Sequence, residues 1–194
     1  KGDQFNKSFL DISPNNKVPA VKIRENNKII SIFESGAILL FFAEKYQKFI
    51  SDDPDKKIET IQWLFWQMAG FGPMLGQAHH FNFYSDEKIN YAINRYTLES
   101  KRLYNILEKR LNNRKWIVDD YSIVDMAIYP WTITTERQGI NINDFPNVLK
   151  WKNNMKERSA VKIGMKIGKE IKKQSKFDKT SRENLFGNNQ YKKR

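Results

Sequence analysis

The sequence changes its hydrophobic pattern at Ser51–Asp55, and this change constrains the fold more than any other feature. Before it, apolar residues alternate with polar ones over Val18–Ile23 and again over Ile29–Phe33, as in β-strands. After it, apolar residues recur every three or four positions, as in amphipathic helices; examples are Ile58, Ile61, Phe65 and Met68, and then Ile89, Ile93, Tyr96, Leu103, Leu107 and Leu111. This order predicts a small α/β unit followed by an all-helical unit.

The pattern predicts four segments. Residues 1–47 form the α/β unit, and residues 48–57, with their polar break, form a linker. Residues 58–171 form a bundle of helices. Residues 172–194 lack periodicity and are rich in basic residues, so we expect a disordered tail there.

Charge and cysteine content narrow the classes of function. The chain has a net charge of +12, of which +8 lies in residues 162–194 with their eleven Lys/Arg and three Asp/Glu. Such a tail can bind an anionic partner, but Lys, Asn and Ile share A/T-rich codons, so base composition explains the charge equally well. With no cysteine, the chain supplies no disulfide, thiolate zinc site or cysteine nucleophile of its own.

No segment of the sequence has the pattern of a membrane span or a signal peptide. The longest apolar run covers residues 37–43, whereas a spanning helix needs about 20 residues. We therefore expect no membrane association and a cytoplasmic location.

Three short motifs carry specific information. Asn16-Lys17-Val18-Pro19-Ala20 leads into the first predicted strand, and Phe33-Glu34-Ser35-Gly36-Ala37-Ile38 leads from the second strand into a helix, with Ser35 as a plausible N-cap. Ser122-Ile123-Val124-Asp125 has the pattern of a capping box, with Asp in place of the usual Glu. We interpret Ser122 and Asp125 as structural residues that start a helix over 123–134.

Together with further segments, these motifs resemble the glutathione transferase family. Those segments are Lys1-Gly2-Asp3-Gln4-Phe5, Gln62-Trp63-Leu64-Phe65-Trp66-Gln67, Gly72-Pro73-Met74-Leu75-Gly76-Gln77 and His79-His80-Phe81, and they are similar to the nu class. That class contains bacterial glutathione-dependent disulfide-bond oxidoreductases. The resemblance covers residues 1–165 and leaves out the basic tail.

The resemblance implies a partial thioredoxin-like N-terminal domain, of α/β class, and an all-α C-terminal helical bundle. It also implies a cytoplasmic homodimer, with a dimer seam along the helix from Ile58, that uses glutathione to reduce small disulfides. The family's first domain begins with a strand, a helix and a second strand, and this segment carries the Thr and Asn that hold the glutathione sulfur. We therefore assign no catalytic residue within this chain.

The resemblance also implies a set of glutathione-binding residues. The Val18–Pro19 bond is cis in the family, and the backbone of Val18 pairs with the cysteinyl unit like an added strand. Ser35, at a helix start, binds the γ-glutamyl carboxylate, and Glu34 accepts from its ammonium. Simple helix capping is the alternative for Glu34 and Ser35, and the proline motif upstream favours ligand binding.

Three more residues are binding candidates with plainer alternatives. Gln4 and Lys17 are placed by the resemblance near the peptide and its glycyl end, although either is also compatible with solvated surface. Arg102 matches an arginine that reaches glutathione in relatives, and an ion pair with Glu99 on one helix face is an equally good interpretation.

Other candidates are weaker. Adjacent His79 and His80 point about 100° apart on a helix and lack a third ligand nearby, so we predict no metal site. A non-catalytic regulatory or binding protein of the same fold is the main alternative function. Nucleic-acid binding through the basic tail is the least favoured of the three.

Overall fold

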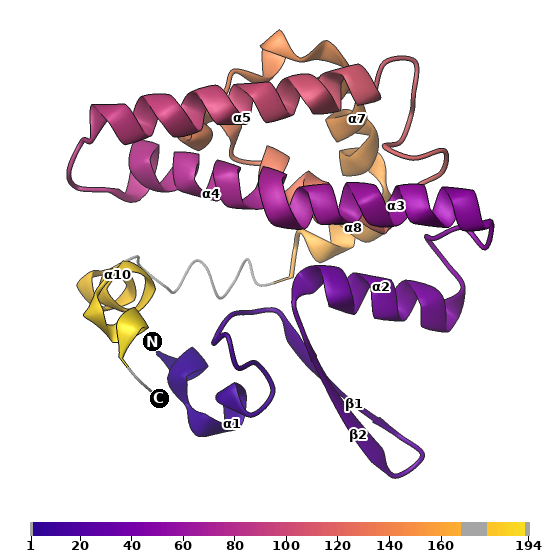
Figure 1. Cartoon of the computed structure of the whole chain (residues 1–194), viewed down its shortest axis with the longest axis horizontal. Helices are drawn as coiled ribbons and strands as arrows, with labels where there is room; N and C mark the ends of the chain where they lie inside the picture. The colour runs from indigo at the N-terminus through magenta and orange to yellow at the C-terminus, as the bar shows by residue number, and fades with distance from the viewer. Residues whose placement is uncertain (1, 168–177, 193–194) are drawn as a thin grey trace. The chain divides into compact units, whose positions relative to one another are not determined.

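The structure is a computed structural model that describes residues 2–167 and 178–192 (Figure 1). Its contacts divide the chain into one unit of residues 1–38 and 159–194 and a second unit of residues 39–158. The predicted boundaries at residues 47 and 58 differ from this division because helix α2 (Ser35–Tyr46) runs from the first unit into the second. Among the described residues, none of the helices is long and apolar enough to cross a membrane.

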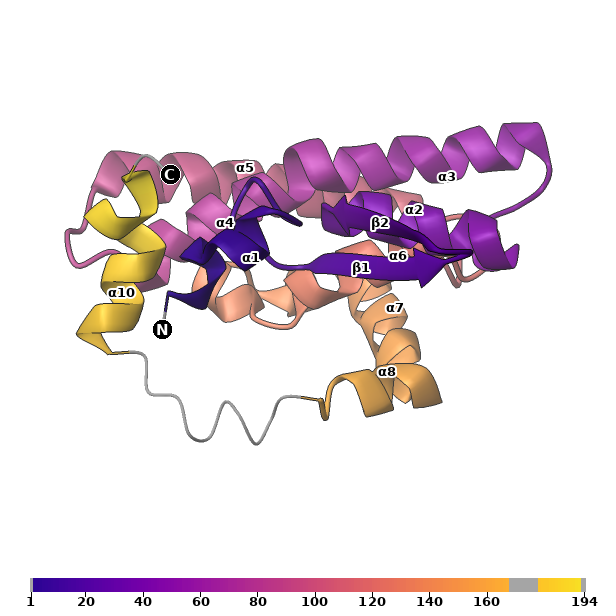
Figure 2. The ribbon, with the colours of Figure 1, turned by 90° about the horizontal axis from the view of Figure 1, so that it is seen from below.

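The first unit contains one antiparallel hairpin. Strands β1 (Ala20–Glu25) and β2 (Lys28–Phe33) pair from Ala20 opposite Phe33 to Glu25 opposite Lys28, as the two arrows in Figure 2 show. The two residues between them, Asn26 and Asn27, have φ angles of 46° and 62°. Asparagine tolerates such angles, and a two-residue turn of this kind matches the twist of the strands. The predicted hairpin is therefore confirmed.

Two short helices, η1 (Asp3–Phe5) and α1 (Lys7–Leu10), precede the hairpin. The apolar run that follows the hairpin forms α2, and this helix is not buried on both sides. Within α2 only Gly36 and Ala43 are buried, and its other apolar residues are partly or fully exposed. The physical reason is that a hairpin of two strands offers too narrow a layer to cover an apolar helix.

The second unit is helical. Its elements follow in the order α3 (Pro54–Trp66), η2 (Gln67–Phe71), α4 (Gly72–His79), η3 (His80–Tyr84), α5 (Asn90–Arg110), α6 (Ile123–Ile128), η4 (Tyr129–Thr132), η5 (Thr135–Gln138), η6 (Ile142–Asp144) and α7 (Pro146–Glu157). Figure 1 shows α3 and α4 as one long run of helix beneath α5. Buried side chains from α4, α5, α6 and α7, among them Leu75, Leu107, Ile128 and Trp151, fill the core.

Two helix boundaries differ from the predicted ones. Helix α3 begins inside the predicted linker, because Asp53 accepts from the backbone N–H groups of Asp55 and Lys56 at 3.0 Å and Pro54 occupies the first turn. Helix α6 ends at Ile128 rather than Thr134 and continues as the 3₁₀ turn η4. Pro130 explains this end, because it has no N–H for the helix and its ring clashes with the preceding turn.

The glycine-rich stretch at residues 70–76 does not break the helix. The turns just before and at its start are wider than those of an α-helix. Residues 67–71 form the π-helix η2, and α4 follows without a gap. A Cβ atom on Gly72 would lie 2.7 Å from Gln67 Nε2 and 3.1 Å from the Trp131 ring. Glycine is therefore needed at position 72 for this close approach.

The C-terminal residues return to the first unit. Helix α8 (Ser159–Gly164) lies near the end of the helical segment predicted over residues 58–171, of which residues 168–171 lie outside the described residues. The expectation of a disordered tail is wrong where α10 (Lys179–Phe186) and η7 (Asn188–Tyr191) form. Asp178 caps α10 by accepting from the Ser181 N–H at 2.8 Å. The weak hydrophobic periodicity of this segment does not predict a helix. Residues 172–177 and 193–194 of the predicted tail lie outside the described residues.

Candidate functional site

A short loop before β1 presents the backbone of Val18. The Val18–Pro19 bond is cis, and the Val18 residue is 78% exposed. Behind it, the buried Ser13 hydroxyl donates to the Lys17 carbonyl at 2.8 Å, and the Asn16 N–H donates to the Ser13 carbonyl at 2.9 Å. The loop is thus tied to the protein on one side while Val18 remains open to a ligand on the other.

The second half of the site is the start of α2. Glu34 has a left-handed φ of 69°, and its carbonyl accepts from the Ile38 N–H at 3.0 Å. Glu34 therefore occupies the N-cap position, and Ser35 is the first helical residue, which corrects the assignment of Ser35 as the cap. The backbone of a residue other than glycine is strained in this conformation, and such strain is concentrated at functional sites.

A hollow of about 60 Å³ joins these two features, and we call it the Val18 hollow. Its lining consists of Ser13, Lys17, Val18, Pro19, Phe33, Glu34 and Ser35. Its size suits one end of a peptide rather than a whole tripeptide. Five of the predicted binding residues are thus brought together, from segments separated by the whole hairpin.

Sequence reasoning missed two residues that support the hollow. The sequence motifs assign neither Ser13 nor Asn15 to the binding site. Asn15 donates its amide to the Glu34 carboxylate at 3.4 Å, so the loop and the helix start are linked directly. Neither role has a signal in a single sequence, because both depend on the way the hairpin folds back.

Gln4 and Arg102 lie outside the lining of this hollow. Gln4 is part of η1. Arg102 lies on α5 in the other unit, and its Nε and an Nη atom each donate to the Glu99 carboxylate at 2.8 Å. Arg102 therefore forms the ion pair with Glu99 that the sequence offered as an alternative, and these hydrogen bonds lower the pKa of Glu99. Binding of glutathione by Gln4 and Arg102 stays a prediction.

Ser122 and Asp125 form the predicted capping box. The Asp125 carboxylate accepts from the Ser122 N–H at 3.0 Å, and the Ser122 hydroxyl accepts from the Val124 N–H at 3.2 Å. Asp125 also accepts from Trp151 Nε1 at 2.7 Å and from the Ile117 N–H at 3.2 Å. Burial raises the pKa of Asp125, and these donors oppose that effect. Both residues therefore contribute hydrogen bonds that hold the start of α6.

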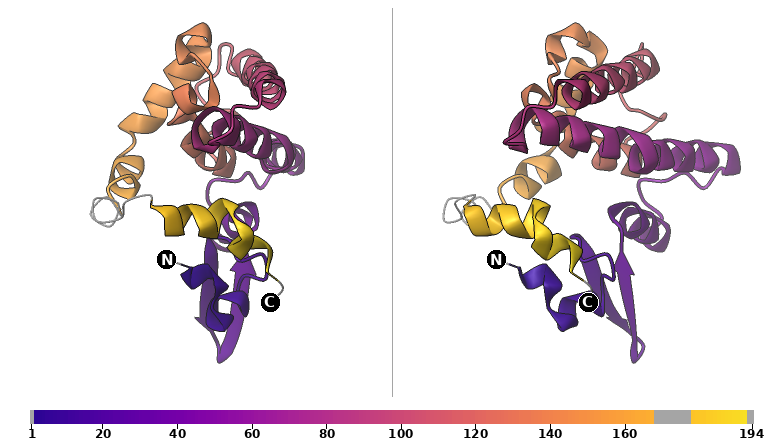
Figure 3. Two further views of the ribbon diagram at one scale, coloured as in Figure 1. Left: turned by 90° about the vertical axis from the view of Figure 1, so that its left-hand side faces the viewer. Right: turned by 60° about the vertical axis from the view of Figure 1, so that its left-hand side comes forward.

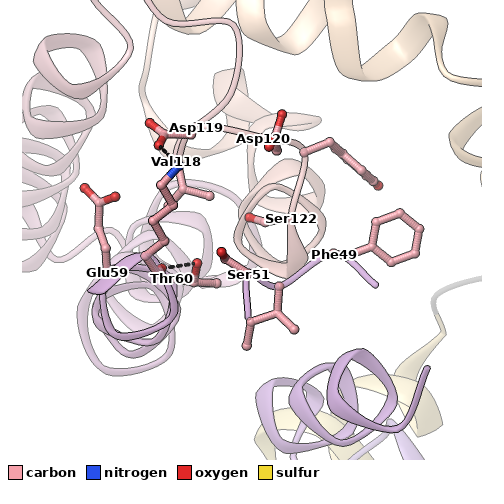
Figure 4. Close-up of a pocket in the computed structure, with 11 residues that line it drawn as sticks. Phe49, Ser51, Glu59, Thr60, Val118, Asp119, Asp120 and Ser122 are labelled. Carbon is pink, nitrogen blue, oxygen red and sulfur yellow. Dashed lines mark hydrogen bonds and ion pairs between the residues drawn. The ribbon is translucent and has the colours of Figure 1, made fainter. Parts of the chain in front are cut away.

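A hollow of about 250 Å³ lies on the helical unit between α3 and residues 118–122 (Figure 4). Three of its charged lining residues form ion pairs. Lys56 Nζ lies 3.3 Å from the Asp119 carboxylate, which also pairs with Arg114 at 3.3 Å. Glu59 pairs with Arg110 at 2.5 Å, and the Thr60 hydroxyl donates to the Lys56 carbonyl.

The two histidines each contact an aromatic ring. The His79 ring stacks on Tyr84 with 4.8 Å between ring centres, and burial, together with the charge of Arg137, lowers the pKa of His79. His80 contacts Phe81 edge to face. The part of the chain that the structure describes contains no group of three or more metal-ligating side chains.

Comparison with known proteins gives a consistent result. Residues 76–159 match the C-terminal domain of glutathione S-transferase. The disulfide-bond oxidoreductase YfcG of Escherichia coli K12 is 47% identical over 164 residues, which cover 82% of this chain and 76% of YfcG. The chain belongs to the glutathione transferase family. This confirms the resemblance noted from the motifs.

Two further relatives support this membership in the glutathione transferase family. The disulfide-bond oxidoreductase YghU of the same bacterium is 42% identical over 84% of this chain, and the match spans 59% of YghU. A crystal structure of a glutathione transferase from Pseudomonas putida, with one glutathione disulfide bound per subunit, has a TM-score of 0.81. It is 38% identical and covers 86% of this chain and 76% of its own. The predicted glutathione transferase fold is therefore confirmed.

Proposed function

We propose that this protein binds glutathione and uses it to reduce small disulfides. The overall reaction is 2 GSH + R–S–S–R → GSSG + 2 RSH, in which the disulfide gains two electrons and two protons and two glutathiones lose them. One observation carries the proposal: the Val18 hollow joins the exposed residue Val18, at a cis bond, to the start of helix α2. The names of the relatives support the same chemistry.

The groups that line the Val18 hollow suit the ends of glutathione. Val18 is 78% exposed, so a peptide can pair with its N–H and C=O as an added strand. The first turn of α2 has N–H groups and a dipole that favour a carboxylate next to Ser35. The Glu34 carboxylate, already close to the Asn15 amide, can accept from an ammonium. Lys17 adds a positive charge for the second carboxylate.

The absence of cysteine fits this proposal. Thiol–disulfide exchange needs a thiolate that attacks a disulfide sulfur, and here the bound glutathione supplies it. The chain's own residues then bind and orient the tripeptide, which raises the effective concentration of its thiol. We assign no residue of this chain to the sulfur atom itself.

We further propose that the protein is a homodimer that works in the cytoplasm, where reduced glutathione is abundant and disulfides are scarce. Ile58 and Phe65 lie two turns apart on α3 and are 53% and 63% exposed. A second copy of the chain can cover this face. Sedimentation of the parent chain should give a dimer, and Phe65→Glu should shift it toward the monomer.

The proposed activity is tested by titration with glutathione and by turnover of 2-hydroxyethyl disulfide with glutathione. Glu34→Gln and Ser35→Ala should each weaken glutathione binding about 10- to 100-fold, the effect of losing one hydrogen bond to a charged group. Glu87→Gln removes an exposed carboxylate from the helical unit and serves as the charge-matched control.

Two results would reject parts of the proposal. If Glu34→Gln, Ser35→Ala and Glu87→Gln all bind glutathione like the parent, the Val18 hollow is not the binding site. If the parent binds glutathione but turns over the disulfide no faster than solution, the protein is a non-catalytic binding or regulatory member of the family. Retained partner binding in both site variants would favour the same conclusion.

A further inference from the structure

The C-terminal segment packs against the start of the chain within the first unit (Figure 3). Asn184 of α10 is only 7% exposed, and its amide nitrogen lies 3.4 Å from the position that a Cβ atom on Gly2 would occupy. A polar side chain so far buried on a short helix indicates a defined contact and not a random association. The resemblance to relatives ends before this segment, so the family does not predict the contact.

Internal hydrogen bonds orient the end of this segment. Asn189 donates its side-chain amide to Asn184 Oδ1 at 3.0 Å, and its backbone N–H donates to the Glu183 carboxylate at 3.3 Å. The same Glu183 carboxylate folds over Gly187 and occupies the space that a Cβ atom would need. These contacts set the direction in which η7 leaves α10, and Gln190 lies in η7.

Gln190 reaches the loop that leads into the Val18 hollow. Its Nε2 atom donates to Asn16 Oδ1 at 3.2 Å, a bond between residues 174 positions apart. Asn16 has a left-handed φ of 48° and directly precedes Lys17 and Val18. We call residues 15–18 the site loop. The bond therefore fixes the side chain of the one residue in the site loop that has a left-handed backbone conformation.

We propose that Gln190 is a positioning residue that holds the site loop in the conformation that binds glutathione. The proposal rests on the proposed function, since it assumes that the Val18 backbone is the binding surface. The site loop is tied at both ends by Ser13 and by the Asn15–Glu34 bond, and Gln190 adds the only side-chain hydrogen bond that Asn16 makes among the described residues. If the loop leaves its binding conformation part of the time, the apparent affinity falls by that fraction.

The experiment compares Gln190→Ala with Asn188→Ala in the full chain. Asn188 is exposed on the same turn and serves as the matched control. Gln190→Ala should weaken binding of reduced glutathione about two- to tenfold, the usual effect of one neutral hydrogen bond. The backbone amides of the site loop should also exchange hydrogen faster, while the thermal midpoint stays at the parent value. Asn188→Ala should match the parent in all three measurements.

A double-variant cycle shows whether Gln190 acts through Asn16. Asn16→Gly removes the acceptor but keeps the left-handed backbone without strain. If the two residues act as one unit, Gln190→Ala with Asn16→Gly should bind glutathione no more weakly than the weaker single variant. Additive losses would overturn the proposal, because Gln190 would then act on the site by another route.

Failure of the Gln190–Asn16 contact and failure of the proposed function give different results. If the parent binds glutathione and Gln190→Ala changes neither affinity nor exchange in the site loop, the positioning role is wrong and the proposed function stands. If the parent binds no glutathione, the proposed function is wrong and exchange alone decides the contact. Faster exchange in Gln190→Ala then supports the contact, and unchanged exchange rejects it.

Discussion

Replacing Asp125 should destabilise the helical unit strongly for so small a side chain. It is 0% exposed and connects three parts of the chain. Its two oxygens accept from Trp151 Nε1 at 2.7 Å, from the Ser122 N–H at 3.0 Å and from the Ile117 N–H at 3.2 Å. Replacing Asp125 with Ala leaves these three donors buried and without an acceptor.

The magnitude follows from those three donors. A buried donor that loses its partner costs about 1–3 kcal/mol, so three of them cost at least about 3 kcal/mol. Removing the buried carboxylate offsets part of this loss of stability, because burial disfavours the charged form of Asp125 and raises its pKa. We therefore expect Asp125→Ala to lower the free energy of unfolding by about 3–5 kcal/mol. Asp125→Asn should fall between Ala and the parent, because its amide oxygen still accepts but its amide nitrogen faces a donor.

The measurement is unfolding of the full chain in urea, followed by far-UV circular dichroism. The neighbouring Asp120→Ala is the control, because Asp120 is exposed and should change stability by less than about 0.5 kcal/mol. A loss below about 1 kcal/mol in Asp125→Ala, less than one unsatisfied donor costs, would refute the reasoning. Equal losses in Asp120→Ala and Asp125→Ala would refute it as well.

Three further outcomes are expected from urea unfolding. Asp53→Ala should cost about 1 kcal/mol, because the cap of α3 loses both of its N–H bonds. Gly72→Ala should cost about 1–3 kcal/mol through its contact with Trp131, whereas Gly70→Ala, with open space around its Cβ position, should be neutral or stabilising. The lowered pKa of His79 means that the unfolded chain takes up the proton first. Stability should therefore fall as pH drops below about 6.5, by less than the limit of about 1.4 kcal/mol per pH unit, and His79→Gln should flatten this slope.

The parts of the fold that follow local rules could be predicted from the sequence. The hairpin depends on Asn26 and Asn27, which tolerate positive φ, and the capping box depends on Ser122 and Asp125. Other boundaries required a choice between competing signals. In the sequence, Asp53 and Pro54 are typical of a polar linker, whereas in the structure they begin α3. The helical pattern of the sequence continues beyond Ile128, although Pro130 ends the α-helix there.

The candidate site was predictable only in part, for a physical reason. Lys17, Val18, Glu34 and Ser35 belong to short motifs, so a resemblance can identify them. Ser13 and Asn15 act through hydrogen bonds to a carbonyl and to a carboxylate 19 residues away, and such partners are set by the folded backbone. Gln190 is harder still to predict, because it lies 174 residues from its partner Asn16, in a C-terminal segment that has no family pattern.

The cysteine content and the geometry of the Val18 hollow lead to one requirement for catalysis. A protein without a thiol can promote disulfide exchange only by binding a thiol and by holding its sulfur in line with the disulfide. Binding energy must then come from groups away from the sulfur, and under the proposed function these are the backbone atoms of Val18 and the first turn of α2. Backbone groups keep their positions only if the loops that carry them are fixed. The bonds from Ser13, Asn15 and Gln190 to the site loop and its neighbour Glu34 are therefore as much a condition for the proposed activity as the residues that would touch glutathione.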